Sequence, residues 1–145
     1  MTTKSFIKTL SANDVGTTGG HMGGILVPKG NGELLTFLPR LDASMLNPSA
    51  WIDCKTPENT VLRLRYVYYN NRLHVPKGTR NEYRITHLTN FLRSENAKEG
   101  DAFEISKDDG SHTYRIRVLA KSGSLEDDSD APVRIKLTSG WRRVH

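Results

Sequence analysis

The clearest periodic pattern in the chain lies in residues 60–69, which read TVLRLRYVYY. Leucines and Tyr66 alternate there with a second set of side chains that includes Arg63 and Arg65. Because successive side chains of a β-strand point to opposite faces, this alternation predicts a long strand. We expect a strand of a barrel with both arginines on its outer surface, and contact between these arginines and phosphate is the alternative.

The other segments favour a mainly β chain with little helix. Asn31 is expected to cap a short helix that runs through Leu38, and residues 87–93 can form a second short helix. Six further strands are expected, in residues 4–10, 25–27, from Trp51 onward, 102–106, 112–120 and 132–137. Together these segments predict an open, mostly antiparallel barrel of seven strands with two short helices.

Length and charge indicate one domain with a polyanionic partner. The chain has 145 residues, which fits a single domain, and its formal net charge is +5. Between Val61 and Arg93 there are seven basic residues and a single acid, whereas between Ser94 and Ala131 ten acids outnumber five bases. One part of the molecule can therefore face nucleic acid while another part is repelled by it.

Several classes of protein are disfavoured by what the sequence lacks. The single cysteine, Cys54, has no internal disulfide partner, and the five histidines are scattered without the spacing of a metal site. The first residues, MTTKSFIKTL, have no long apolar run typical of a signal peptide or membrane anchor. Neither GxxxxGK[ST] nor GxGxxG occurs. We therefore expect a cytoplasmic protein with no membrane association and no small-molecule substrate.

The stretch from Tyr69 to Arg84 is the strongest candidate for a binding element. It carries four basic residues and one acid, Glu82, and its Pro-Lys-Gly turn predicts an arm that projects from the barrel. In an extended chain Arg80, Glu82 and Arg84 share a face. Arginine is the commonest partner of guanine O6 and N7, and glutamate accepts from cytosine N4, so this trio suits G·C pairs. The alternative is a solvated hairpin with an Arg–Glu surface pair.

A second candidate element is the glycine-rich run from Asn13 to Gly24. It places five glycines among small polar side chains, so its backbone can approach a phosphate closely and offer N–H donors. The alternative is a flexible hairpin loop without a ligand.

These two stretches resemble the N-terminal effector domain of EcoRII-type restriction endonucleases. The resemblance rests on YYNNR followed by GTRNEYRIT, and on LSANDVGTTGGHMGGILVPKG from Leu10 to Gly30, and it covers roughly the first ninety residues. It implies a DNA-binding pseudobarrel, a fold also seen in plant auxin-response factors, that clamps duplex DNA between two arms. Such enzymes join this domain to a nuclease domain, which 145 residues cannot also contain.

The resemblance therefore implies a non-catalytic domain in residues 1–140, with residues 141–145 as a tail or the start of a linker to an absent nuclease domain. A natural stand-alone binder is the other interpretation. Binding would need no cofactor, and Mg²⁺ would be needed only if a nuclease domain were attached. The DNA site would resemble CC(A/T)GG.

Site residues follow from the resemblance position by position. The residues expected to read bases are Arg80, Asn81, Glu82, Arg84, Arg72 and His21. The residues expected to contact the DNA backbone or to shape the loops are Lys8, Asn13, Asp14, Thr17, Thr18, Lys29, Asn70, Asn71, Lys77 and Thr79. The chain departs from the family pattern at three positions: Tyr83 replaces a lysine, Leu26 replaces a tyrosine, and Lys77 is separated by Gly78 from the threonine.

Two other functions remain open from the residues alone. Asp42, Asp53 and Lys55 could form a small Mg²⁺ nuclease site, because an acid followed by D-x-K is a common nuclease pattern. Tyr66, Tyr68 and Tyr69 could stack on single-stranded nucleic acid, with burial in the barrel core as their alternative.

Overall fold

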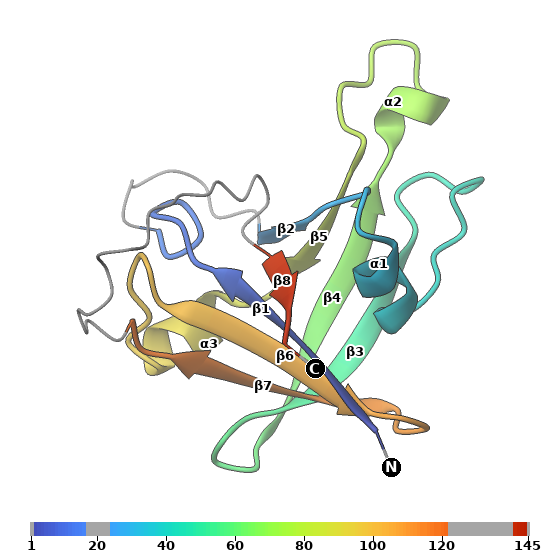
Figure 1. Cartoon of the computed structure of the whole chain (residues 1–145). Helices are drawn as coiled ribbons and strands as arrows, with labels where there is room; N and C mark the ends of the chain where they lie inside the picture. The colour runs from blue at the N-terminus through green and yellow to red at the C-terminus, as the bar shows by residue number, and fades with distance from the viewer. Residues whose placement is uncertain (1, 17–23, 122–140, 145) are drawn as a thin grey trace.

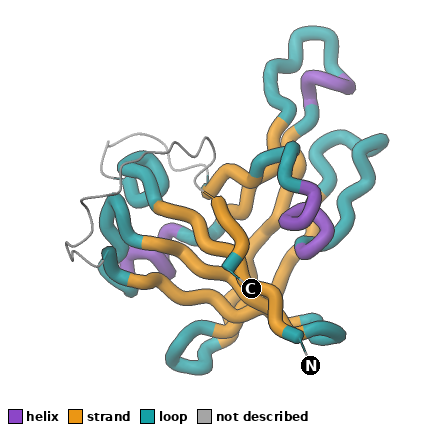
Figure 2. The backbone as a smooth tube through the Cα atoms, in the orientation of Figure 1, coloured by secondary structure: helices purple, strands orange, loops and turns teal. Residues whose placement is uncertain are grey.

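The computed structural model describes residues 2–16, 24–121 and 141–144. This part of the chain forms a curled open sheet of eight strands in the order β2-β5-β4-β3-β7-β6-β1-β8 (Figures 1 and 2). The strands are β1 (Thr3–Thr9), β2 (Ile25–Val27), β3 (Ser49–Lys55), β4 (Val61–Tyr69), β5 (Glu82–Thr86), β6 (Ala102–Asp108), β7 (Thr113–Leu119) and β8 (Trp141–Arg143). The helices are α1 (Gly32–Phe37), α2 (Asn71–His74) and α3 (Thr89–Ser94).

The sheet consists of two antiparallel halves joined by one parallel contact. The half that contains β2, β5, β4 and β3 meets the half that contains β7, β6, β1 and β8 where β3 pairs in parallel with β7. Asp53 lies opposite Thr113 in this contact, and all other pairings are antiparallel. The expectation of a mostly antiparallel β fold is confirmed.

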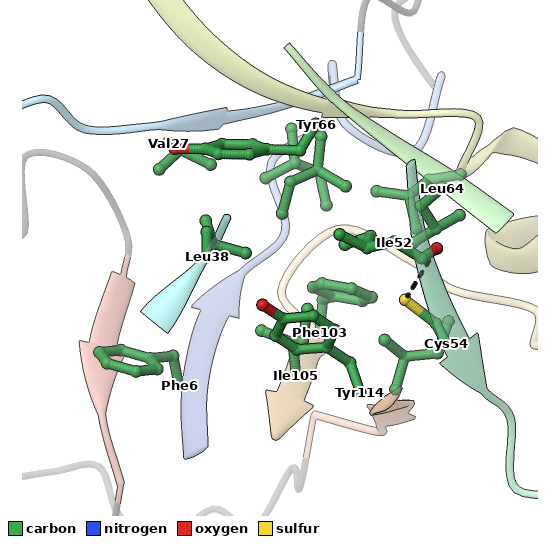
Figure 3. Close-up of a cluster of buried hydrophobic side chains, with 14 of the residues drawn as sticks. Phe6, Val27, Leu38, Ile52, Cys54, Leu64, Tyr66, Phe103, Ile105 and Tyr114 are labelled. Atoms are coloured by element: carbon green, nitrogen blue, oxygen red, sulfur yellow. Dashed lines mark hydrogen bonds between the residues drawn. The ribbon is translucent and has the colours of Figure 1, made fainter. Parts of the chain in front are cut away.

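The core fills the inside of the curl, where the alternation of β4 places half of its side chains. Leu64 and Tyr66 are 0% and 1% exposed. They belong to one buried cluster with Phe6, Phe103 and Tyr114 (Figure 3). Burial of this apolar surface is the main force that closes the sheet. Arg63, on the alternate side of β4, is exposed as expected.

Helix α1 lies against this core and begins where the sequence indicates. The Asn31 side chain accepts a hydrogen bond from the Leu34 backbone N–H at 3.1 Å, which confirms the predicted cap. Leu34 and Phe37 are buried, and the Tyr114 hydroxyl donates to the Phe37 carbonyl at 2.7 Å. This bond fixes the end of the helix to β7.

The number of elements differs from the expected seven strands and two helices. Neither β5 nor the short α2 was expected as a regular element; α2 lies within the stretch predicted as an arm, and β5 begins in it. The strand expected in residues 132–137 lies outside the described residues.

Residues 141–145, which were expected to be a tail or the start of a linker, include a strand of the sheet. Trp141 to Arg143 form β8, which pairs with β1, and Trp141 is only 5% exposed. The Trp141 indole N–H donates to the Leu26 carbonyl at 2.8 Å, so it links β8 to β2 at the opposite edge of the sheet. One aromatic residue followed by two arginines has no periodicity, and only the tertiary structure shows its role. A linker beyond these residues stays a prediction.

Candidate nucleic-acid interface

A narrow arm, residues 70–81, leaves the sheet between β4 and β5 and carries α2 (Figure 1). We call it the recognition arm. Its two sides are joined by hydrogen bonds from the Arg72 N–H to the Arg80 carbonyl at 3.0 Å and from the Arg80 N–H to the Asn71 side chain at 2.8 Å. Gly78 packs so closely that an added Cβ would lie 2.2 Å from the Asn71 carbonyl oxygen. The arm therefore has a defined shape.

At the base of the recognition arm Glu82 lies between two arginines. Its Oε2 accepts from Arg80 Nη2 at 2.7 Å and from Arg84 Nε at 2.6 Å. The Arg80 guanidinium also lies over the Tyr69 ring, 3.8 Å from the ring centroid. Glu82 and Arg84 lie on one side of β5, and Arg80, which precedes the strand, reaches the same carboxylate, as the sequence predicts. We call these three side chains the Arg–Glu–Arg cluster.

The cluster keeps its carboxylate charged and leaves acceptor capacity unused. Partial burial raises the pKa of Glu82, but the hydrogen bonds and the positive charges of Arg80 and Arg84 together outweigh burial, so this pKa lies below its ordinary value. Both arginines donate to Oε2, and no donor among the described residues lies on Oε1. The side chain of Glu82 is 29% exposed. An ionised oxygen is thus available to an external donor.

Arg84 connects the cluster to the end of the glycine-rich run. Its Nη1 donates to the Gly24 carbonyl at 3.0 Å. Gly24 has a φ of +93°, and an added Cβ would lie 2.4 Å from the Ile85 carbonyl oxygen, so only glycine fits here. The two stretches singled out in the sequence therefore meet at Arg84.

Asn81 and Tyr83 are directed into the protein. The Tyr68 hydroxyl donates to Asn81 Oδ1 at 2.5 Å. Tyr83 stacks on Tyr68 with ring centroids 4.2 Å apart and planes at 4°. Tyr83, which stands where the family pattern has a lysine, is therefore an aromatic packing residue. Base reading by Asn81 stays a prediction and would require a change of partner.

Lys8 and Asp14 bind each other instead of lying open on the first arm. Lys8 Nζ lies 2.6 Å from Asp14 Oδ2, and both side chains are 8% exposed. The same oxygen accepts from the Ser11 N–H at 2.9 Å. The Lys8 ammonium is therefore satisfied inside the protein, and Asp14 shapes the start of the loop. A contact of Lys8 with the DNA backbone stays a prediction and would require the ion pair to open. The expected contacts Thr17, Thr18 and His21 lie outside the described residues.

Asn70, which was expected to contact the DNA backbone or to shape a loop, is 0% exposed. It bonds the loop before β3, as described below, and does not face solvent. Asn71 is half-buried and accepts from the Arg80 N–H. The expected contact residues that are exposed are Asn13, Lys29, Arg72, Lys77 and Thr79.

The two acids of the alternative nuclease site are bound to other side chains. Asp42 precedes β3 and accepts from the Ser44 N–H and hydroxyl, which lowers the pKa of Asp42. Asp53 pairs with Arg63 at 3.3 Å, and Lys55 is the last residue of β3. No cluster of three His, Cys, Asp or Glu residues able to hold a metal ion occurs in the described part of the chain. The nuclease interpretation is not supported.

Two of the three tyrosines that could form a stacking platform are buried. Tyr66 and Tyr68 are 1% and 6% exposed, so they belong to the core and cannot stack on bases. None of the helices in the described residues is long and apolar enough to cross a membrane.

Comparison with known proteins identifies the family. The family described as "Restriction endonuclease EcoRII, N-terminal" matches residues 1–122. The chain belongs to this family. It is also similar to the type II restriction enzyme EcoRII of Escherichia coli, with 44% identity over 89 residues that cover 56% of this chain and 20% of the relative. The chain thus spans about a fifth of the length of that curated relative.

Three parts of the site in this EcoRII-type N-terminal domain were not found from the sequence. They are the Gly24 carbonyl as a partner of Arg84, the Tyr69 ring beneath Arg80, and the contact between Asn47 and Asn70. The position of Tyr69 one residue before the arm was the available signal for the second. The other two depend on contacts between segments far apart in the sequence.

Proposed function

We propose that the chain is a DNA-recognition domain that reads a double-stranded site resembling CC(A/T)GG. The observation that carries this proposal is the Arg–Glu–Arg cluster at the base of the recognition arm. Family membership supports DNA as the partner. The excess of basic over acidic residues between positions 61 and 93, the segment that contains the cluster, supports DNA binding through this part of the surface.

The cluster has the donors and acceptors that a G·C pair requires. Arg80 and Arg84 each keep N–H groups beyond those that bind Glu82, and these can donate to guanine O6 and N7. The free Oε1 of Glu82 can accept from cytosine N4. Because both ion pairs use Oε2, the cytosine contact does not require either ion pair to break. The free protein would then already hold its base-reading groups near their working positions.

Phosphate contacts would come from exposed side chains around the cluster. Lys77 lies on the recognition arm, and Lys29 follows β2. Such contacts fix the register on the duplex without reading sequence. The glycine-rich run would approach from the other side as a second arm, since Gly24 already contacts Arg84.

We place cleavage in a covalently linked nuclease domain of a longer protein, which would require Mg²⁺ there. The domain itself would bind DNA without a cofactor, in the bacterial cytoplasm. The proposal of a further domain is supported by the restriction enzyme EcoRII, of whose length the chain spans only about a fifth.

Competition binding tests the proposal. The pure chain is titrated against a CC(A/T)GG duplex and against a duplex changed at one G·C pair, with a parallel incubation in Mg²⁺ for strand cleavage. We expect preference for the first duplex and no cleavage. Equal affinity for the two duplexes would overturn sequence-specific reading, and cleavage by the pure chain would return the nuclease interpretation.

A further inference from the structure

We propose that residues 42–48, which precede β3, form a brace that sets the direction of the recognition arm, and that Asn70 is a positioning residue for DNA recognition. This inference rests on the proposed function, and it concerns the loop between α1 and β3. We call residues 42–48 the brace loop. In Figure 1 it rises between α1 and β3, next to α2.

Asn70 and Asn47 bind each other reciprocally. The Asn47 N–H donates to Asn70 Oδ1 at 2.7 Å, and the Asn70 N–H donates to Asn47 Oδ1 at 3.0 Å. Asn70 Nδ2 also donates to the carbonyls of Ala43 and Met45 at 3.2 and 2.8 Å. Both donors of the amide are therefore used within the brace loop, and the residue is fully buried.

The Asn70 side chain does not cap helix α2, although Asn70 occupies the capping position. Asn70 is the N-cap residue of α2, and an asparagine there ordinarily accepts from a free N–H of the helix. No such bond is made, because the amide is turned to the brace loop. A second contact, between His74 Nε2 and the Ala43 carbonyl at 2.9 Å, ties the last residue of α2 to the same loop.

Neither partner has an apolar core of its own. Helix α2 has four residues and none of them is buried. In the brace loop Met45 and Leu46 are 57% and 52% exposed. The hydrogen bonds of Arg80 with Arg72 and Asn71 fix the shape of the recognition arm but not its direction. The direction of the recognition arm relative to the sheet therefore depends on its junctions with β4 and β5 and on its contacts with the brace loop.

The direction of the arm matters because base reading tolerates little displacement. Arg80 lies at the point where the arm returns to β5, and its N–H is held by Asn71, which directly follows Asn70. If the arm sampled several directions, only the fraction in the reading conformation would bind the cognate site, and apparent affinity would fall by that fraction. Contacts to phosphate would persist from many directions, so discrimination would suffer more than general affinity.

Two matched glycine substitutions test the brace. Asn47 and Asn59 both have positive φ, +48° and +67°, so glycine keeps either backbone conformation. Asn47→Gly removes the acceptor for the Asn70 N–H, whereas Asn59 lies in the distant turn between β3 and β4, where only its backbone bond to Thr56 is seen. We expect Asn47→Gly to lose about tenfold in affinity for the CC(A/T)GG duplex and less than about twofold for the altered duplex. Asn59→Gly should bind both duplexes like the parent.

Hydrogen exchange supplies a readout that does not depend on DNA. Asn47→Gly and Asn70→Ala should exchange faster in residues 71–81 and at the parent rate in β6 and β7. If Asn70→Ala fails to fold, Asn47→Gly alone decides. Unchanged discrimination and unchanged exchange in Asn47→Gly would overturn the brace. If the parent itself shows no preference between duplexes while exchange in the variant rises, the proposed function fails and the brace remains as a structural device.

Discussion

Arg84 and Glu82 form an ion pair of 2.6 Å between Nε and Oε2, and they lie two residues apart on the same side of β5. Arg84 also donates to the Gly24 carbonyl, so one guanidinium joins the Arg–Glu–Arg cluster to the glycine-rich run. An ion pair between fully exposed side chains contributes little to stability. Here the side chains of Arg84 and Glu82 are only 21% and 29% exposed, and Arg80 binds the same carboxylate oxygen. The pairing orders groups that would face a base pair.

Replacing Glu82 with alanine separates base reading from a purely electrostatic grip. Removing an acid from a surface that faces DNA relieves repulsion, so an electrostatic grip predicts tighter binding to every duplex. A carboxylate that accepts from cytosine predicts a loss of about 1–3 kcal/mol of discrimination between the CC(A/T)GG duplex and a duplex changed at one G·C pair. We expect the loss, measured by competition binding.

Glu58→Ala is the matched control, because Glu58 is an exposed acid at the opposite end of β4 from the arm. It removes the same charge without touching the cluster, so its discrimination should equal that of the parent. Tighter binding of Glu82→Ala to both duplexes with an unchanged ratio would return this stretch to the interpretation of a basic hairpin.

Replacing Lys77 with alanine tests the phosphate contact on the recognition arm. Lys77 is exposed in the turn of the arm. Each neutralised phosphate contributes about 0.9 to the slope of log affinity against log salt, so the slope should flatten by about that amount. Cognate and altered duplexes should weaken alike. Lys55→Ala, at the far end of β3, should keep the parent slope, and a parent slope in Lys77→Ala would remove this lysine from the interface.

Local sequence patterns were sufficient to predict those features that depend on a single strand or a single helix end. The alternation in residues 60–69 predicted β4, and Asn31 was placed correctly as a cap. The shared face of Arg80, Glu82 and Arg84 followed from the geometry of an extended chain and is confirmed by the two ion pairs. Each of these inferences needs no knowledge of other segments.

The remaining features depend on where distant segments meet. Lys8 was expected to contact phosphate, but its pairing with Asp14 and its burial follow from the position of β1 inside the sheet. The side-chain amide of Asn70 is hydrogen-bonded to a loop more than twenty residues earlier in the chain. Trp141 packs on strands formed near the beginning of the chain. No window of the sequence contains these partners.

Asp101 predicts a pH dependence of stability that can be isolated with one variant. Its two carboxylate oxygens accept from the backbone N–H groups of Lys121 and Lys98 at 2.8 and 2.9 Å. The hydrogen bond from Lys121 is the main cause that lowers the pKa of Asp101 below its ordinary value of 3.8. A lowered pKa in the folded state stabilises the protein fully above the unfolded pKa, and this stabilisation is lost as pH falls through the folded pKa.

Asp101→Asn should therefore be less stable than the parent at pH 7, by about 1–3 kcal/mol, because one N–H would face the amide group of asparagine. The difference should shrink when thermal unfolding is repeated at a pH below the lowered pKa of folded Asp101, where the parent carboxyl is also neutral. Asp109→Asn, in the exposed turn after β6, should match the parent at both pH values. A constant difference across pH for Asp101→Asn would exclude ionisation of Asp101 as the cause.

Gly78→Ala tests whether the shape of the recognition arm matters beyond its charge. The added Cβ would lie 2.2 Å from the Asn71 carbonyl oxygen, a backbone atom that cannot move without reshaping the arm. Because α2 has no buried residue, the sheet should fold and melt much like the parent. We expect discrimination between the two duplexes to fall by about tenfold, since Arg80 and Asn71 are displaced together while every charge is kept.

Gly30→Ala is the control, because a Cβ there meets no atom within 4 Å. Parent-like discrimination by Gly78→Ala, with an unchanged melting temperature, would show that the arm binds DNA through charge alone and that its fixed geometry is not needed for reading.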